Sequence, residues 1–206
     1  MNELYEISLS LCVGLGLAAA CGFRVFVPLL VMSVAAKTGH LETTEGFAWL
    51  ASDAAVATLA VATAIEIFAY YIPVVDNFLD AIATPCAVIA GTVAMSAHIP
   101  EMAPWLKWAL AAIAGGAAAG AVQGATAVIR GASTATTGGL ANPVVSTGEA
   151  AASTGLSAVA ILAPLLGLVG LACVIGVVGW KVAVRKPSEA ERLPVTSLPQ
   201  PVTIDV

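Results

Sequence analysis

Charged residues are scarce in this chain. Asp, Glu, Lys and Arg together make up only 10% of its 206 residues, whereas hydrophobic residues make up 59%. A water-soluble domain is roughly one quarter charged, so there is too little polar surface here to cover one. The scarcity argues against a separate soluble domain and predicts an integral membrane protein whose main partner is the lipid bilayer.

Basic residues, cysteines and histidines are also too few or too scattered for several familiar functions. The net charge is -5, and the sequence offers no basic patch for nucleic acid. Its four cysteines form no CxxC pair and its two histidines stand far apart, so we expect neither a metal site nor a cofactor. We find no HExxH motif and no catalytic triad pattern, and do not expect an enzyme.

Long apolar runs dominate what is present. A membrane span needs about 20 apolar residues, and the runs predict an all-α, polytopic transmembrane helix bundle of about five spans. This bundle would occupy residues 1–185, with a disordered, proline-rich cytoplasmic tail at 186–206. The expected spans cover about Leu9–Ala36, Phe47–Ile72, Ala81–Ala97, Trp105–Ile129 and part of Ala150–Val184, where a short half-helix could precede the span.

The first run could instead be a cleaved signal peptide, because it contains three consecutive alanines at 18–20. However, the residues before it are acidic rather than basic, and the apolar run continues well past the alanines. We therefore expect a retained first span.

Basic residues near the ends of the runs predict the orientation. With the N-terminus outside, Lys37, Lys107 and the basic residues after Trp180 all lie on the cytoplasmic side, as the positive-inside rule favours. We expect a multi-pass protein of the bacterial inner (plasma) membrane, with the C-terminus in the cytoplasm and Asp76 and Asp80 outside.

Small residues recur at a spacing of four in the fourth run. Gly116, Gly120 and Gly124 would form one stripe along a helix, which allows another helix to approach closely. Packing within a single bundle explains the stripe most simply. The alternative is an interface in a homo-oligomer.

Two charges lie deep within the apolar runs, Arg24 in the first and Glu66 in the second. A charge near the bilayer centre costs about 2.5 to 3.5 kcal/mol, so it needs a partner or a wet cavity. Arg24 and Glu66 could form a structural salt bridge, or both could face a polar cavity open to the outside.

A short helix is expected to begin at Pro73 and to place Asp76 and Asp80 on one face. Two carboxylates so placed suit a cation or a pair of basic partners. A solvated loop helix with an acidic first turn would show the same spacing.

The segment from Arg130 to Glu149 is rich in glycine and hydroxyl groups yet nearly uncharged. Gly138 and Gly139 permit turns closed to other residues, and the Asn142-Pro143 pair favours a new helix start. Non-helical backbone at membrane depth must be satisfied by protein or by water in a cavity. We predict a broken or re-entrant polar segment near 130–149, non-helical around Thr137 to Asn142.

These polar residues together predict one substrate or ion site. Arg130 should reach an acidic residue, either Asp76, Asp80 or Glu149. The candidate site residues are Arg24, Glu66, Asp76, Asp80, Gln123, Arg130, Ser133, Thr134, Thr137, Asn142 and Glu149.

The chain resembles a bacterial membrane-protein family catalogued as domain of unknown function 4126, over roughly residues 8 to 180. In that family a His and a Lys often precede the matching Arg, where this chain has Gln123 and Thr126. An acidic pair often stands where it has Glu149 and Ala150. The resemblance implies no established activity. It rests on Gly16–Leu29, on Asp76–Pro85 and on the polar positions Arg130, Ser133, Thr134, Thr137, Gly138, Gly139, Asn142, Pro143, Ser146 and Glu149.

Intramembrane charge beside a helix interrupted by glycine and proline is typical of transporter sites. We therefore expect a small transporter or channel-like protein for a small polar or ionic solute. The two arginines favour an anion, whereas the carboxylates favour a cation or proton coupling. The alternative is a membrane scaffold whose charges only hold its helices together.

Overall fold

The computed structural model describes residues 2–164, 166 and 176, and every regular element in this part of the chain is helical. Four of its helices are long and apolar enough to cross a membrane, or five if a bent pair counts as one span, which confirms the predicted all-α bundle. The elements are α1 (Asn2–Cys21), α2 (Phe26–Lys37), the 3-10 helix η1 (Glu45–Ala51), α3 (Asp53–Ala69), α4 (Pro73–Ser96), α5 (Pro104–Ala111), the π-helical turn η2 (Ala112–Gly116), α6 (Ala117–Thr137) and α7 (Asn142–Leu162).

Local sequence explains where several helices begin and end. Helices α4, α5 and α7 each carry a proline in their first turn, where its missing N–H costs nothing. Ser52 caps α3 by accepting a hydrogen bond from the Ala55 amide. Helix α6 ends at Gly138, whose φ of 64° is open to glycine at little cost.

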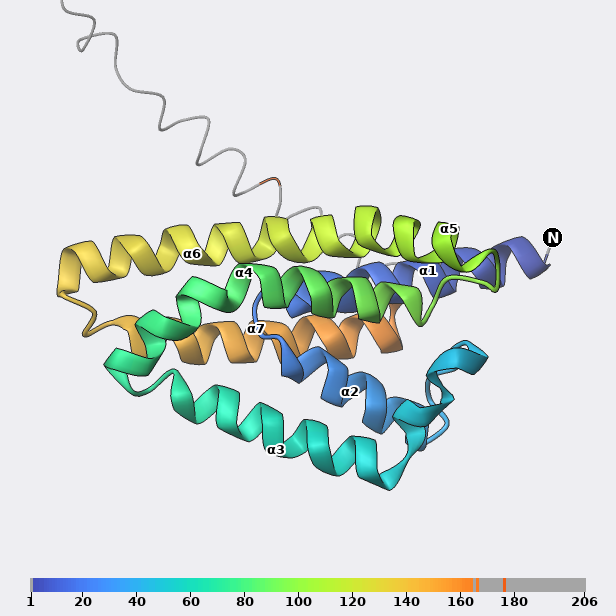
Figure 1. Cartoon of the computed structure of the whole chain (residues 1–206), viewed down its shortest axis with the longest axis horizontal. Coiled ribbons are helices and arrows are strands. Elements are labelled where there is room, and N and C mark those ends of the chain that lie inside the picture. The colour runs from blue at the N-terminus through green and yellow to red at the C-terminus, as the bar shows by residue number, and fades with distance from the viewer. Residues whose placement is uncertain (1, 165, 167–175, 177–206) are drawn as a thin grey trace, which may run out of the picture.

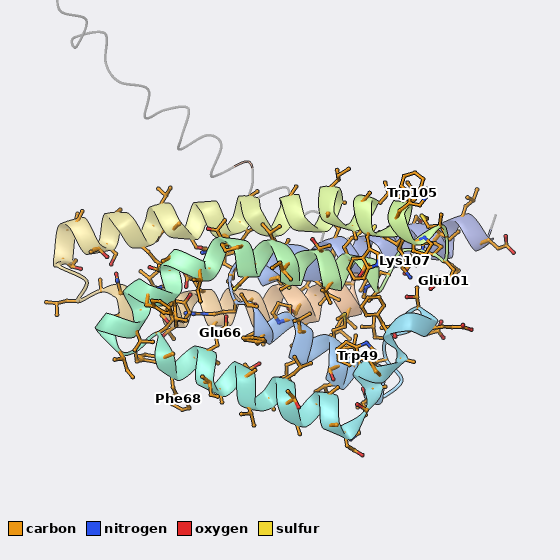
Figure 2. All side chains as sticks on the ribbon, in the orientation of Figure 1. Trp49, Glu66, Phe68, Glu101, Trp105 and Lys107 are labelled. Carbon is orange, nitrogen blue, oxygen red and sulfur yellow. The ribbon has the colours of Figure 1, made fainter. Side chains whose placement is uncertain are left out.

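Helix α1 is the centre of the bundle and contacts α2, α4, α6 and α7 (Figure 1). Its residues Leu17 to Cys21 are fully buried, mostly as alanines that let the neighbouring helices come close. Helix α3 lies at the edge, where it packs on α2 and η1. Figure 2 shows its Glu66 directed toward the other helices and its Phe68 directed away from them.

The predicted single span over Leu9–Ala36 is wrong. Helix α1 ends at Cys21, and after the break α2 runs back toward the end of the bundle where α1 began (Figure 1). If the helix continued through Arg24, its backbone hydrogen bonds would be kept, but the Arg24 side chain would lie away from the residues that bind it. The break instead leaves Arg24 only 2% exposed.

This reversal changes the predicted arrangement of the chain ends. Ser10 donates a hydrogen bond to the His98 carbonyl at 3.0 Å, and the Thr44 amide donates to the Ala97 carbonyl at 3.0 Å. The start of α1 therefore lies at the same end as the loops that follow Lys37 and Ser96. The start of α4, with its aspartates, lies at the opposite end (Figure 1). The prediction that the N-terminus and Asp76 share one side of the membrane is wrong.

The second, third and fourth runs differ in detail from the expected spans. The second consists of η1 and α3, which meet at an angle of 69°. The third begins at Pro73 as one helix with Pro85 in its interior, so the expected separate short helix is the first part of α4. The fourth extends over Pro104–Thr137, 34 residues. That is roughly 50 Å at 1.5 Å per residue, longer than the roughly 30 Å hydrocarbon core.

The glycine stripe of the fourth run packs within the same chain. A Cβ atom on Gly116 would lie 2.9 Å from the Thr92 hydroxyl oxygen of α4, and one on Gly120 would lie 3.2 Å from a Val88 methyl group. Gly124 has no atom within 4 Å of its position for a Cβ. Two of the three glycines therefore lie against α4, whereas an interface with a second copy stays a prediction.

Two tryptophans lie at the end of the bundle where the N-terminus lies (Figure 2). Trp49 and Trp105 are exposed there, as expected for side chains at headgroup level. Lys107 is buried instead, and its Nζ donates to Glu101 Oε1 at 2.9 Å and to Thr44 Oγ1 at 3.1 Å. Lys107 therefore links the loop before η1 to the loop before α5.

Helix α7 begins at Asn142, before the stretch in which the fifth span was expected. The second half of that stretch and the predicted tail at 186–206 lie outside the described residues.

Candidate functional site

Six side chains from five parts of the chain form a buried charge cluster. Asp76 and Asp80 lie one turn apart in α4, Arg130 lies on α6 and Glu149 on α7. Arg24 lies in the break between α1 and α2, and Tyr70 is the residue after α3. The charge cluster consists of Arg24, Tyr70, Asp76, Asp80, Arg130 and Glu149.

Arg130 is the hub of the charge cluster and is 3% exposed. Its Nε donates to both carboxylate oxygens of Glu149, at 2.9 and 3.2 Å, and its Nη2 also pairs with Glu149. Its Nη1 donates to Asp76 Oδ1 at 2.6 Å and lies 3.5 Å from Asp80 Oδ1. The predicted contact between Arg130 and an acidic residue is confirmed, and all three candidate carboxylates are within 4 Å.

Arg24 approaches the same carboxylate from the other side. Its Nη2 lies 3.3 Å from Glu149 Oε2, donates to the Ser146 carbonyl at 3.0 Å and also bonds the Ser146 hydroxyl. Both guanidinium groups lie over the Tyr70 ring, with their Cζ atoms 3.8 Å (Arg24) and 4.3 Å (Arg130) from its centroid. An aromatic face attracts cations, so Tyr70 helps to hold two like charges close together.

The hypothesis that Arg24 and Glu66 form a salt bridge is wrong for the described geometry. The Glu66 carboxylate accepts hydrogen bonds from the amides of Val25 and Phe26, at 2.8 and 3.0 Å. These amides lie at the start of α2, where a helix leaves its N–H groups free and its dipole attracts an anion. Glu66 therefore stabilises the break in the backbone, while Arg24 binds α7.

The predicted interruption of the 130–149 segment is confirmed. The chain leaves helical geometry at Gly138 and Gly139, which have φ angles of 64° and 87°, and α7 starts at Asn142. Asn142 Nδ2 donates to Asp76 Oδ2 at 2.9 Å and to Thr134 Oγ1 at 3.2 Å. These hydrogen bonds attach the turn to α4.

Besides Glu66, Thr134 and Asn142, three further predicted site residues lie outside the charge cluster. Gln123 lies about two turns before Arg130 on α6. Thr137 makes local contacts, donating to the Ser133 carbonyl and accepting from the Ala141 amide. The Ser133 hydroxyl has no hydrogen-bond partner among the described residues. Ser133 and Thr137 follow Arg130 in the last two turns of α6.

Two contributors were absent from the predicted site residues. Ser146 stands three residues before Glu149, so helical spacing places both on one face of α7 and could have indicated it. Tyr70 follows α3 in the sequence, and no local pattern separates it from an ordinary interfacial tyrosine.

A cavity of about 120 Å³ adjoins the charge cluster at the α6–α7 turn. Asp76, Asn142 and Thr134 line it together with Tyr70, Tyr71 and the turn residues. Among the described residues that line it, the charged one is Asp76. In the part of the chain that the structure describes, no three His, Cys, Asp or Glu residues are placed to hold a metal ion.

Comparison with curated proteins and with solved structures gives no match. Residues 11–184, most of the chain, match the family described as "Domain of unknown function (DUF4126)". The match includes every member of the charge cluster and the turn beside it. The chain therefore belongs to the family of domain of unknown function 4126.

Proposed function

We propose that this protein is a small transporter or channel-like protein for a small ionic solute. The observation that carries the proposal is a buried cluster of two guanidinium groups and three carboxylates beside a cavity at one end of a membrane helix bundle. Ion pairs buried in a protein contribute little net stability, because desolvation offsets their attraction. Charge that is kept in a membrane bundle is therefore a candidate for a functional site.

The engagement of Arg130 with carboxylates and the excess of carboxylates in the charge cluster favour a cationic solute or a proton over an anion. The N–H groups of Arg130 face Glu149 and Asp76, and Arg24 also faces Glu149. An anion at Arg130 would have to displace one of these carboxylates, whereas Arg24 Nε and Nη1 have no hydrogen-bond partner among the described residues. The charge cluster also holds three carboxylates against two guanidinium groups, which leaves one negative charge in excess.

We also propose that the N-terminus is outside and the C-terminus is in the cytoplasm of a bacterial inner membrane. The two lysines at the N-terminal end are each paired with an acid, Lys37 with Asp53 and Lys107 with Glu101. The basic residues after Trp180 would reach the opposite side if the apolar run before Val184 crosses once more. The positive-inside rule then makes the side of the charge cluster cytoplasmic.

A membrane scaffold is the alternative function, and one observation favours it. The Arg130 side chain on α6 is bonded to both α4 and α7, as expected of a residue that holds helices together. In that case the charge cluster would be needed for folding and for nothing else.

Ion flux measured in vesicles with purified protein separates the two functions. Cation or proton flux that falls at least tenfold in Asp80→Asn, with the variant still folded, supports the transporter. Asp53→Asn is the matched control, because it neutralises an exposed carboxylate at the other end. Absence of flux for every small cation, anion and proton gradient in wild-type vesicles would favour the scaffold.

A further inference from the structure

An open pocket of about 630 Å³ lies at the end of the bundle opposite the charge cluster (Figure 2). The 3-10 helix η1 lines it with Glu45 and Trp49, and the chain around the start of α5 lines it with Glu101 and Trp108. Ligand pockets commonly measure about 300 to 1,000 Å³, so this pocket has room for an organic group. Its lining residues are all different from those of the charge cluster, so a ligand here does not depend on the proposed transport.

Contacts between its walls hold the pocket in place. Lys107 Nζ donates to Glu101 Oε1 and to Thr44 Oγ1, on opposite sides of the pocket. The Phe47 and Trp108 ring centroids are 6.4 Å apart, and Lys107 Nζ lies 5.8 Å from the Phe47 centroid. The pocket is therefore formed before any ligand arrives, which lowers the free-energy cost of binding one.

The charge of the pocket selects a cation. Lys107 is buried and paired with Glu101 at 2.9 Å, so its ammonium group is already neutralised. The Glu101 side chain is still 63% exposed. Glu45 is exposed, and its carboxylate has no ion-pair partner among the described residues. Two carboxylates against one lysine leave one negative charge in excess.

Two indole rings favour an organic ammonium group over a metal ion. Trp49 and Trp108 border the pocket and are 54% and 47% exposed. The face of an aromatic ring attracts a cation, and tryptophan does so best. A metal ion would need several oxygen ligands, whereas much of this wall is apolar and includes Val93 and Met102.

The position of the pocket indicates a lipid as the source of this ammonium group. Exposed tryptophans of a membrane protein lie at headgroup level, where a zwitterionic phospholipid presents its ammonium group beside its own apolar part. Lipids with a net negative charge are recognised by clusters of Lys and Arg, and this pocket has the opposite charge. We infer that the pocket binds the headgroup of a zwitterionic phospholipid, with its ammonium group facing the carboxylates of Glu45 and Glu101 and the indole rings.

Native mass spectrometry of the purified protein in detergent tests this site without any transport. The protein is mixed with equal amounts of phosphatidylethanolamine, phosphatidylcholine and phosphatidylglycerol that carry the same acyl chains. We expect at least one of the two zwitterionic lipids to be bound about fivefold more than phosphatidylglycerol, because one charge near the membrane surface changes binding by roughly that factor.

Two matched pairs of variants place the binding in the pocket. Glu45→Gln should lower the preference for the zwitterionic lipid about threefold. Its control is Glu42→Gln, an exposed acid three residues away that does not line the pocket.

Trp49→Leu should lower the preference by a similar factor, because it removes an aromatic face. Its control is Trp105→Leu, since Trp105 is 74% exposed and does not line the pocket. The preference is a ratio taken within each variant, so a general loss of lipid binding cancels. Both controls should keep the wild-type ratio.

Several results would overturn the inference. One is the absence of bound lipid, or phosphatidylglycerol bound as well as the zwitterionic lipids. Another is a ratio that the pocket variants leave unchanged, or that the control variants lower equally. A third is displacement of the bound lipid by a large molar excess of free ethanolamine or choline, which would make this a site for a soluble amine. Retention of the lipid in that excess supports the lipid.

Discussion

Arg130 donates from its Nε to both carboxylate oxygens of Glu149, at 2.9 and 3.2 Å, although the two residues belong to different helices. A planar guanidinium facing a carboxylate in this way fixes orientation as well as distance. The pair holds α6 against α7, and the turn that connects these two helices begins with two glycines. Several properties of the protein should depend on it.

Removing Arg130 should destabilise the fold more than removing either partner of an exposed ion pair. Arg130→Ala leaves Asp76 and Glu149 buried without their cation, and breaking such a pair costs about 3 to 5 kcal/mol. Arg130→Lys should recover only part of this loss, because an amine cannot make the forked contact. Melting temperatures in detergent measure the effect. Lys37→Ala is the control, and an equal loss in that variant would contradict the assignment.

Arg24 should couple to Glu149 and not to Glu66. In double-mutant cycles with alanine, Arg24 and Glu149 should give a coupling energy of at least about 1 kcal/mol, because they are in contact. Arg24 and Glu66 should give a smaller value, because the Glu66 carboxylate binds the Val25 and Phe26 amides. Unfolding of the four variants of each cycle provides the measurement. The reverse order of coupling would mean that Arg24 and Glu66 form the pair.

Gly138→Ala should destabilise the protein by about 1 kcal/mol or more. Its φ of 64° lies in the left-handed region, where a Cβ is strained. Gly131→Ala is the matched control on the same helix, because it has open space around the added Cβ and a helical backbone. The control should be neutral or stabilising, since alanine favours a helix. Equal effects of both substitutions on the melting temperature would exclude the turn as the cause.

Close packing of the fourth run on α4 should make Gly116 less tolerant than Gly124. Gly116→Ala brings a Cβ to 2.9 Å from the Thr92 hydroxyl oxygen, whereas Gly124 has open space. We expect a lower melting temperature for Gly116→Ala alone. Gly124→Ala would lower it only if that position met a second copy, and a change in oligomeric state by light scattering would then reveal the interface.

Membrane sidedness can be tested with single cysteines in a background without Cys12, Cys21, Cys86 and Cys173. Cysteines at Glu3 and Glu42 should react with an impermeant reagent from one side, and a cysteine at Leu140 from the other. Leu140 suits the test because it is 87% exposed at the α6–α7 turn. Labelling of Glu3 and Glu42 from opposite sides would restore a single crossing by Leu9–Ala36.

The sequence by itself determined that this protein is a helical membrane bundle. With 59% hydrophobic residues, much of its apolar surface has to face lipid, where a helix satisfies its own backbone hydrogen bonds. It also determined where the 130–149 segment breaks, since Gly138 and Gly139 set the backbone locally. Arg130 was expected to meet a carboxylate because an unpaired charge at that depth is too costly.

Only the tertiary structure decided which charges meet. Arg24 and Glu66 are the two deepest charges in the sequence, yet Arg24 binds Glu149 and Glu66 binds free amides. The choice depends on the reversal after Cys21, which apolar composition does not reveal because the helices on both sides of the reversal are apolar. Pairing across a bundle is set by which helices lie side by side, and hydropathy along the chain carries no such information.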